Sequence, residues 1–509
     1  LPGISISLSS EVCPEIREYE RQSTTCANAY VQPKMSRYLL QLNKELHDLG
    51  LDCPFFLMTS GGGLTTLETA TKYPVRLIES GPAGGAILAS QIARECKVEN
   101  VVSYDMGGTT AKICLIDGYE PQSTRTFEVA RVYRNLKGSG LPVRIPAIEM
   151  VEIGAGGGSI AHVDAMGRIN VGPESAQADP GPACYNQGGE EPTVTDADVV
   201  LGKIDPARFA GGRVELVPEK AVAVVRKKIG QPMDMSDALA GFAVCEIVDE
   251  NMASAARVHA IEWGKDISAR AMIAFGGAAP LHAARLAEKL KIDQVIVPTG
   301  AGVGSAIGFL RAPISYEVVR SRYVQLAHYD FDMINLLIDE MAEEARSVVT
   351  QGADDDQLEE ARLAFMRYVG QGHEIAVPLP VRSLGIGDDQ LLRQAFETEY
   401  AQLYGRAIPD QDLEILTWTL TLSAHMDRPA EGNVAIETAM PASASGERNL
   451  FDAEKAEFVR APVYLRDDLK PGMFVTGPAL IAEDQTTTAV TASFKAGLDE
   501  RGYLVLNRI

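Results

Sequence analysis

Residues 101–116 read Val-Val-Ser-Tyr-Asp-Met-Gly-Gly-Thr-Thr-Ala-Lys-Ile-Cys-Leu-Ile: an apolar run, an acid, a Gly-Gly-Thr-Thr turn and a second apolar run. This order predicts a strand, a tight turn and a second strand. Gly107 and Gly108 can adopt the positive φ angles of a tight turn, and they let a ligand approach the backbone closely. An ordinary hairpin with a glycine turn would have the same outline.

The polar side chains around this turn favour a phosphate site over an ordinary hairpin. Successive backbone N–H groups of such a turn attract an anion. Thr109 and Thr110 add hydroxyl donors, and Asp105 is placed to hold a magnesium ion or its water shell, because hard cations prefer oxygen ligands. Lys112 could contact phosphate, although a lysine at an outward strand position is equally well a solvated charge. The sequence is not a Walker motif, and no helix follows the turn at once.

Composition and charge exclude several classes of protein. The chain has 509 residues, of which 46% are hydrophobic and 23% charged, and this length predicts two or three domains. A net charge of −22 argues against a nucleic acid or an anionic membrane as partner. No run of 18 apolar residues and no signal-peptide pattern occur, and the seven scattered cysteines form no C-x-x-C pair. We therefore expect a cytoplasmic protein with free thiols.

Glycine-rich turns recur through the first part of the chain. A strand at 54–58 runs into Thr-Ser-Gly-Gly-Gly at 59–63, before a helix at 64–72. That order would put backbone at the carboxyl edge of a sheet, where α/β proteins bind ligands, although a flexible turn is equally plausible. Ser80 is a candidate N-cap for the next helix, whose glycine-rich start suits close packing or an anion.

Residues 119–200 are turn-rich, and their aliphatic and aromatic content favours loops that line a cleft over disorder. A short strand at 151–160 is interrupted by four glycines, Gly156 and Gly157 among them. Glu152 and Asp198 are weaker candidates for the cleft. His162 could be catalytic or a ligand, but a lone histidine after a strand is more often structural.

The next segment has the order of an α/β sheet with ligand loops at one edge. The predicted elements are a helix at 236–263, a strand at 269–275, a glycine turn with a helix to 290, and a strand at 294–298. The glycines at 300, 302 and 304 lack the G-x-G-x-x-G spacing and the following acid of a dinucleotide fingerprint.

After about residue 315 the pattern indicates a second, β-rich α+β domain. We expect domains at 1–315 and 316–509. The elements expected in the second are helices at 331–349 and 391–403, a hairpin of 365–369 with 375–379, strands at 413–423, 462–465 and 479–482, and joints at 440–446 and 470–478.

Together these motifs resemble the A subunit of the hydantoinase/5-oxoprolinase family, whose core belongs to the actin, sugar-kinase and Hsp70 ATPase superfamily. The resemblance implies an actin-like (ribonuclease H-like) α/β ATPase core with a C-terminal α+β, β-rich domain. The matching segments are Ser60–Leu64, Ser80–Gly85, Asp105–Lys112, Glu152–Ile160, Asp179–Tyr185, Glu191–Asp198, Phe275–Ala283, Arg367–Glu374 and Gly477–Glu483.

The resemblance also implies a site for ATP and Mg²⁺. It makes Asp105 a catalytic and metal-binding residue at the second phosphate loop of the superfamily. It places the adenosine-side turn at Phe275–Ala278. The cofactor-binding residues that follow are Gly107, Gly108, Thr109, Thr110, Lys112, Gly156, Gly157, Gly276, Gly277 and Ala278.

The chain departs from the family pattern in three places. Many relatives have Thr-Ser-Thr-Asp after the glycine pair, so Lys112 stands where they carry an acid, which favours the hydantoinase branch. Ala279 stands where the family pattern has glycine. Relatives also carry an N-terminal region with a first phosphate loop, Asp-x-Gly-Gly-Thr, and this chain starts beyond it at Leu1. We expect that another chain supplies that loop, that the sequence is a fragment, or that ATP binding is lost.

By resemblance, the activity is ATP-dependent hydrolysis of a cyclic amide of the hydantoin, N-methylhydantoin or 5-oxoproline type, through phosphorylation of the carbonyl oxygen. The chain would be the A subunit of a homo- or hetero-oligomer, working with a B subunit. One alternative is the ATP-using subunit of an acetone- or acetophenone-type carboxylase, and another is a non-catalytic scaffold subunit. His282 has no role assigned by these patterns.

Overall fold

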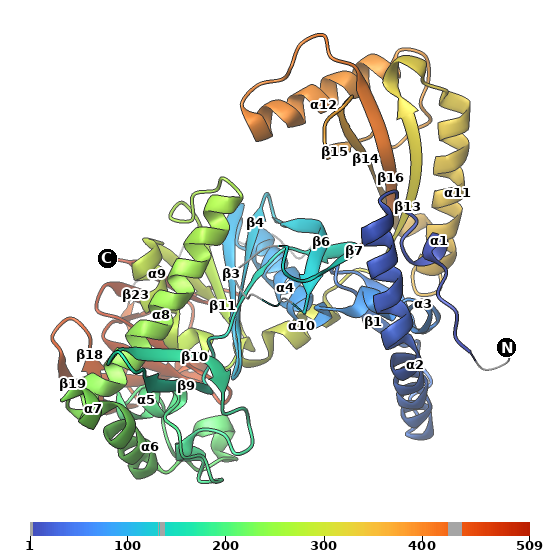
Figure 1. Ribbon diagram of the computed structural model, residues 1–509. Helices are drawn as coiled ribbons and strands as arrows, with labels where there is room; N and C mark the ends of the chain where they lie inside the picture. The colour runs from blue at the N-terminus through green and yellow to red at the C-terminus, as the bar shows by residue number, and fades with distance from the viewer. Residues whose placement is uncertain (1–3, 131, 133–137, 426–439) are drawn as a thin grey trace. The chain divides into compact units, whose positions relative to one another are not determined.

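The computed structural model describes residues 4–130, 132, 138–425 and 440–509, which form two compact units (Figure 1). Unit 1 comprises the described residues of Leu1–Ala83, Ser123–Ile148 and Ala312–Asp427, and unit 2 those of Gly84–Gln122, Glu149–Arg311 and Arg428–Ile509. The division expected from the sequence, 1–315 and 316–509, follows the order of the chain. The compact units instead interleave, because the part after residue 315 is shared between them.

Unit 2 is built on a ten-stranded mixed sheet. Strands β3 (Asn100–Met106) and β4 (Ala111–Asp117) form the predicted antiparallel hairpin, and β11 (Ala271–Phe275) runs parallel to β3 on its other side. All five residues of β11 are buried, as expected for a strand covered on both faces. The strand order is β17-β20-β23-β24-β12-β11-β3-β4-β5, with β8 also beside β4. The remaining strands of the sheet are β5 (Glu120–Pro121), β8 (Val151–Ile153), β12 (Gln294–Val297), β17 (Met440–Pro441), β20 (Met473–Thr476), β23 (Phe494–Leu498) and β24 (Leu504–Arg508).

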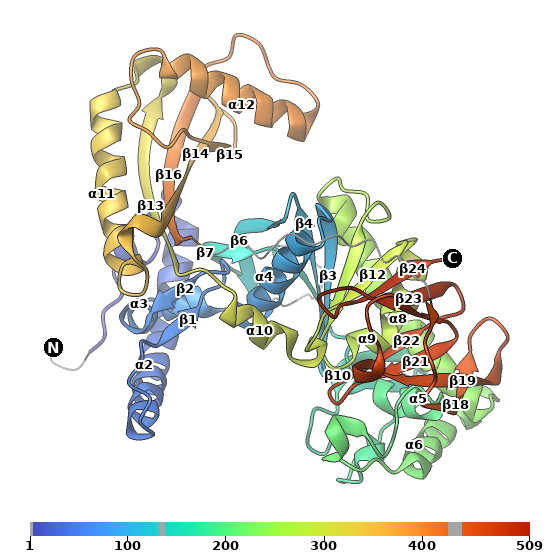
Figure 2. The same ribbon diagram turned by 180° about the vertical axis from the view of Figure 1, so that it is seen from behind.

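Helices cover this sheet largely as the sequence predicts. Helix α8 (Asp237–Glu262) starts after its N-cap Ser236, and it packs on α9 (Ala279–Leu290), which lies on β3, β11 and β12. Helix α4 (Ser80–Glu95) includes Ser80 as its first residue, so Ser80 is not its N-cap. Helices α4 and α10 (Gly304–Leu310) lie side by side, so close that a Cβ on Gly308 would stand 1.8 Å from the Gly84 carbonyl oxygen (Figure 2).

Smaller elements complete unit 2. A four-stranded sheet has the order β18-β19-β21-β22, and β9 pairs with β10. The predicted joints at 440–446 and 470–478 each contain a short strand, β17 and β20. The remaining elements are β9 (Ser159–Val163), β10 (Ile169–Ser175), α5 (Val194–Val200), α6 (Pro218–Val225), α7 (Gln231–Met233), β18 (Gly446–Asp452), β19 (Glu457–Leu465), β21 (Ala479–Ala482) and β22 (Thr487–Val490).

Unit 1 contains a separate antiparallel sheet of order β13-β16-β14-β15. Helix α11 (Phe331–Val349) packs on β13 and β16, and helix α12 (Asp388–Tyr404) packs on β15 (Figure 1). One core joins both helices to the sheet, with Trp418 and Phe396 among its largest buried side chains. Both helices and the hairpin confirm the prediction. The strands are β13 (Ser315–Gln325), β14 (Leu358–Tyr368), β15 (Ile375–Pro378) and β16 (Leu413–Ala424).

The N-terminal part of unit 1 corrects two expectations. Strands β1 (Phe56–Met58) and β2 (Leu64–Thr66) form a two-stranded antiparallel sheet, and Leu64 adds a single bridge to Ile314, so the turn at 59–63 is not at the carboxyl edge of a parallel sheet. The expected helix at 64–72 therefore begins later, at Leu67. The other elements here are α1 (Ser9–Val12), α2 (Glu18–Asp48), α3 (Leu67–Lys72), β6 (Ser123–Val129) and β7 (Leu141–Ile148).

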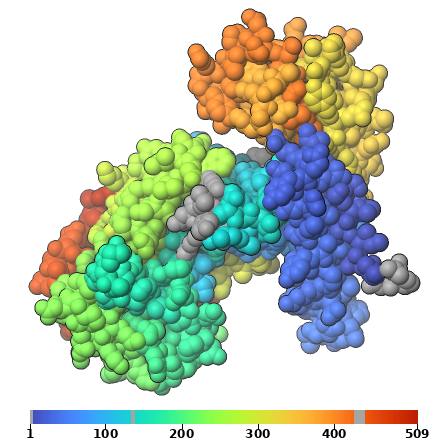
Figure 3. Space-filling model, viewed as in Figure 1, coloured from blue at the N-terminus to red at the C-terminus, as the bar shows by residue number. Residues whose placement is uncertain are grey.

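Helix α2 is longer than its apolar pattern suggests. Its apolar residues recur at helical spacing only from Met35 onward, whereas the helix starts at Glu18 and continues through Pro33. Only Thr24, Asn28 and Leu39 are buried among its 31 residues, and the helix lies on the surface of unit 1 (Figure 3). A helix that buries so little gives no apolar stripe by which its first half could be found. Among the residues that the structure describes, none of the helices combines the length and apolar character that a membrane span requires.

Glu15 should be essential to the stability of unit 1. Its carboxylate is 2% exposed and pairs with two arginines, with Arg125 at 2.9 Å and with the Nε of Arg144. Glu15→Gln would remove one of the two carboxylate partners of each guanidinium, since Arg125 keeps Glu317 and Arg144 keeps Glu374, and loss of a charged hydrogen bond costs about 1.5–3 kcal/mol. Urea unfolding should show a loss of that size, while Glu343→Gln, at an 81% exposed side chain of the same unit, should have almost no effect. Equal stability of the two variants would contradict the prediction.

Candidate functional site

Asp105 lies at the carboxyl end of β3, where the hairpin turn begins. Its Oδ2 accepts a hydrogen bond from Ser305 Oγ at 2.8 Å, and its backbone pairs with Lys112 on β4 and Phe275 on β11. Burial raises the pKa of Asp105, against the opposing effects of the Ser305 hydrogen bond and the Lys112 charge. The turn is closed by a hydrogen bond from the Gly107 N–H to the Thr110 carbonyl oxygen at 3.2 Å.

A second glycine turn packs on the first one. The Gly157 N–H donates to the Gly107 carbonyl oxygen at 3.0 Å, and the Gly158 N–H donates to the Gly108 carbonyl oxygen at 2.6 Å. A Cβ on Gly156 would stand 2.7 Å from the backbone nitrogen of Thr109. Only glycine lets the two backbones approach this closely.

A third glycine turn packs on Asp105 from β11. Gly276 has a φ of +98°, and a Cβ there would stand 2.4 Å from the Met106 carbonyl oxygen and 2.6 Å from Asp105 Oδ1. The Ala278 N–H donates to that same Met106 oxygen at 3.0 Å. Ala279, where glycine was expected, is the first residue of α9 and does not have a positive φ, so alanine causes no strain there.

The three turns, at Gly107–Thr110, Gly156–Gly158 and Gly276–Ala278, therefore pack together at the end of β3: the second lies on the first, and the third lies on Met106 and the Asp105 carboxylate. We call them the glycine turns. No atom lies within 4 Å of a Cβ built on Gly107, Gly108 or Gly277. Gly108 and Thr109 are exposed, and Thr110 is half-buried. The backbone is thus open on one side and tightly packed on the other, as a turn that receives a ligand requires.

Lys112 and Glu152 lie beside the first turn. The Lys112 Nζ bonds to the Thr110 hydroxyl and lies 3.6 Å from Glu152 Oε1, across the β4–β8 pairing. Lys112 is therefore held beside the first turn, on a threonine hydroxyl of that turn, and is not freely solvated; its contact with phosphate stays a prediction. His162 is exposed on β9, opposite Asn170 of β10.

Behind the glycine turns lies a buried charged cluster, consisting of Asp198, Lys203, Asp249 and His282. His282 Nδ1 is 2.8 Å from Asp249 Oδ1, and its Nε2 is 3.2 Å from Asp198 Oδ2. Lys203 Nζ is 2.8 Å from Asp198 Oδ1. The sequence patterns singled out Asp198 but missed Lys203 and Asp249. One signal was available, because Asp249 is an acid on the buried face of an otherwise apolar helix.

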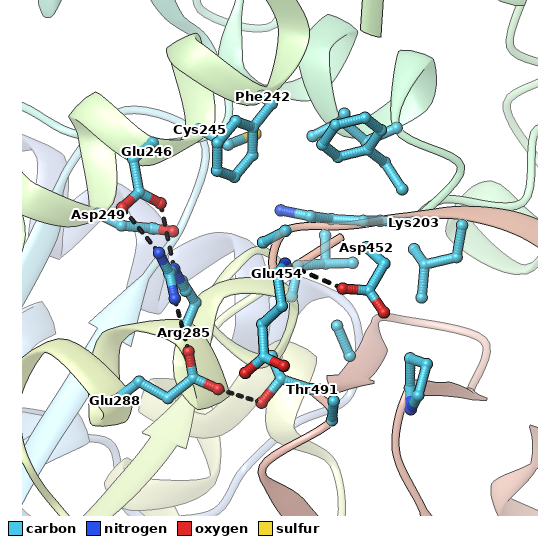
Figure 4. A pocket seen from close by; sticks show the side chains of 18 of the residues that line it. Lys203, Phe242, Cys245, Glu246, Asp249, Arg285, Glu288, Asp452, Glu454 and Thr491 are labelled. Carbon is cyan, nitrogen blue, oxygen red and sulfur yellow. Dashed lines mark hydrogen bonds and ion pairs between the residues drawn. The ribbon is translucent and has the colours of Figure 1, made fainter. Parts of the chain in front are cut away.

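A cavity of about 90 Å³ lies on the far side of this cluster in unit 2 (Figure 4). Lys203, Cys245 and Asp249 contribute to its wall, but none of the predicted cofactor residues does. Arg285, also in the wall, is paired with Glu246 and with Glu288 at 2.9 and 2.8 Å. The cavity is therefore lined by other residues than the glycine turns, and the charge of Arg285 in its wall is neutralised by the two glutamates.

The fold and this geometry define a class: mixed α/β proteins in which interlocking backbone turns, rather than a Walker loop, lie beside a half-buried carboxylate at the end of a central strand. The family model described as "Hydantoinase/oxoprolinase" matches residues 21–318, and its C-terminal domain model matches residues 330–509. The chain belongs to the hydantoinase/oxoprolinase family.

Characterised relatives of this chain are similar over nearly its whole length. The caprolactamase subunit alpha of Pseudomonas jessenii is 32% identical over 98% of this chain and 71% of its own length. The acetophenone carboxylase gamma subunit of Aromatoleum aromaticum is 30% identical over 99% of this chain and 69% of its own. The solved structure of the ATP-dependent caprolactamase from Pseudomonas jessenii superposes with a TM-score of 0.81 at 31% identity, covering 98% of this chain and 72% of that one.

Proposed function

We propose that this chain is the ATP-using subunit of an enzyme that hydrolyses a cyclic amide. The observation that carries the proposal is the packing of the three glycine turns on one another beside Asp105, with open backbone at Gly107, Gly108 and Gly277. The similarity to a caprolactamase subunit supports a lactam, hydantoin or 5-oxoproline as the substrate class.

The residues present fit magnesium and the phosphates of ATP. Backbone N–H groups at Gly108–Thr110 would donate to phosphate oxygens, and the Gly276–Ala278 turn would lie on the adenosine side, as in an actin-like core. Within the described ranges, no group of three or more His, Cys, Asp or Glu side chains is arranged to hold a metal. Magnesium bound to phosphates needs no such group, because one or two carboxylates and water molecules complete its shell. Asp105 is the carboxylate that we assign to it.

The chemistry explains why ATP is needed. An amide carbonyl is a poor electrophile because resonance stabilises it. ATP would supply a phosphoryl group to the carbonyl oxygen, after which water can attack the carbon. The work of this chain is then to position the phosphates and to neutralise their charge, which are the main contributions of proteins to phosphoryl transfer. Lys112, whose ammonium has three N–H donors, could add a charge at the phosphates while it stays bonded to Thr110.

We further propose that a partner subunit of the B type completes the active site. The caprolactamase and acetophenone carboxylase relatives are both named as subunits, which supports a multi-subunit enzyme. The acetophenone carboxylase relative also makes a ketone the second candidate substrate, with the enolate rather than an amide as the phosphoryl acceptor.

Substrate-dependent ATP hydrolysis by the complex of this chain with its partner tests the proposal. We expect phosphate release to rise at least about 10-fold over the rate without substrate when a lactam, hydantoin or 5-oxoproline is added with Mg²⁺. Acetone or acetophenone with bicarbonate should give no such rise. Stimulation by the ketones alone would replace the amidase proposal with carboxylation, and a complex that does not bind Mg-ATP would contradict both.

A further inference from the structure

The buried charged cluster has no role in the function proposed above. The side chains of His282, Asp198 and Asp249 are 0, 2 and 3% exposed, and that of Lys203 is 16% exposed. Charged groups this deep in a protein are costly unless each one is paired. A cluster of this kind therefore requires an explanation.

Hydrogen bonding fixes the charge of the histidine. Both ring nitrogens of His282 face carboxylate oxygens, and an ionised carboxylate can only accept a hydrogen bond. Both nitrogens must then donate, so the ring is an imidazolium. Burial by itself lowers the pKa of His282, but the carboxylates of Asp198 and Asp249 outweigh it and raise the pKa to about 9. Two cations and two anions leave the cluster neutral.

The cluster lies at the base of two glycine turns. His282 is in the first turn of α9, which begins directly after the Gly276–Ala278 turn. Asp198 is on α5, where the Thr195 N–H donates to the Gly157 carbonyl oxygen at 2.7 Å. Asp249 is on α8, which packs on both α5 and α9. One imidazole ring thus joins the helices on which two of the three turns are built.

We propose that His282 is a positioning residue: as an imidazolium, it ties α5 and α9 to α8 and so holds the second glycine turn against the first and the third glycine turn against Asp105. The nucleotide part of this inference rests on the proposed function, while the positioning of the turns does not. When the ring loses its proton, one carboxylate loses its donor and the turns loosen.

Of the described residues, none of the other titratable or charged groups around His282 donates a hydrogen bond to the carboxylate oxygens that face the ring, so none replaces the proton that the ring loses. Lys203 Nζ bonds to Asp198 Oδ1 rather than to the ring. The Cys245 Sγ also bonds to Asp198 Oδ1, at 3.3 Å. Burial raises the pKa of Cys245, and also that of Tyr104 on β3, which the charges of Asp249 and Asp198 raise further. Both groups therefore stay neutral while His282 titrates.

The test compares the wild type with Asp249→Asn and Glu250→Gln, each in the complex with the partner subunit. Glu250 is the matched control, because it is on the same helix but its carboxylate is 49% exposed and pairs with Arg257 and Lys289. We expect the KM for Mg-ATP of the wild type to rise about 10-fold as the pH passes through about 9, with a much smaller change in kcat. Asp249→Asn should move this rise to lower pH by at least about one unit, and Glu250→Gln should leave it in place. The same midpoint in all three proteins would overturn the proposal.

A second measurement requires no nucleotide, and it does not depend on whether the Asp249→Asn variant folds. In the wild-type full chain, NMR titration of labelled histidines, with His282 assigned by His282→Gln, should find its ring cationic until about pH 9. Amide exchange in 156–158 and 276–278, corrected for its intrinsic pH dependence, should increase over the same range. If Mg-ATP does not bind but these changes occur, the proposed function fails and the positioning role stands. Two results would overturn the positioning role. One is a His282 ring that is neutral at pH 7, and the other is amide exchange in the turns that does not change as His282 titrates.

Discussion

Asp105→Asn should lower ATP turnover by the complex at least about 100-fold, because removal of one preorganised electrostatic group from a phosphoryl-transfer site has effects of this size. Asparagine has the same shape and can still accept the hydrogen bond from Ser305 Oγ. Only the charge that would hold magnesium is lost. A coupled assay of ADP release, at saturating Mg-ATP and amide, measures the effect.

The fold should survive this substitution. The pKa of Asp105 is raised above its unfolded value by burial, so the ionised form costs stability in the native state at neutral pH. A neutral amide removes that cost, and the melting temperature should therefore stay the same or rise. Asp266→Asn, at an exposed acid of unit 2, should leave both turnover and melting unchanged. Normal turnover in Asp105→Asn would refute the role assigned to this carboxylate.

Two adjacent glycines should respond in opposite ways to alanine. Gly276→Ala should cost about 3 kcal/mol of stability, because Gly276 has a φ of +98° and the new Cβ would stand 2.4 Å from a carbonyl oxygen. Gly277→Ala should change stability by less than about 1 kcal/mol, because its φ is not positive and nothing lies within 4 Å of its Cβ position.

Nucleotide binding should depend on Gly277, the glycine whose substitution hardly changes stability. If phosphate or ribose occupies the open space at Gly277, a methyl group there should weaken Mg-ATP binding at least about 10-fold in a protein that is otherwise as stable as the wild type. Calorimetry of both variants, together with their denaturant midpoints, separates a folding defect from a binding defect. Unimpaired binding by Gly277→Ala would show that this face of the turn does not receive the nucleotide.

The sequence predicts much of the secondary structure of both units. Strands and helices with a strong period appear where they were expected, such as α8, α11 and the β3–β4 hairpin. The predictions were wrong where that signal was weak. The first half of α2 is polar and exposed, and the 59–63 turn resembles a strand-to-helix loop although it joins two short antiparallel strands.

The candidate site divides in a similar way. Asp105 and the glycines of all three turns were singled out one by one, from the residues that flank them and from the family resemblance. Their roles as ligands of ATP and magnesium remain predictions. Lys203 and Asp249 were not assigned, because no local pattern shows that Lys203 pairs with Asp198 or that Asp249 pairs with His282 of another helix.

By itself, the sequence determined which turns could lie close to a ligand. Only glycine tolerates the required backbone angles and lets a ligand come close to the backbone, and the polar side chains beside each turn can be read from the neighbouring residues. Tertiary structure alone decided that the second turn packs on the first, that the third packs on Asp105, and that His282 carries a charge behind them. It also decided that the last third of the chain is divided between two units. These properties depend on contacts between residues more than 30 positions apart, and the chain order does not encode such contacts in any local pattern.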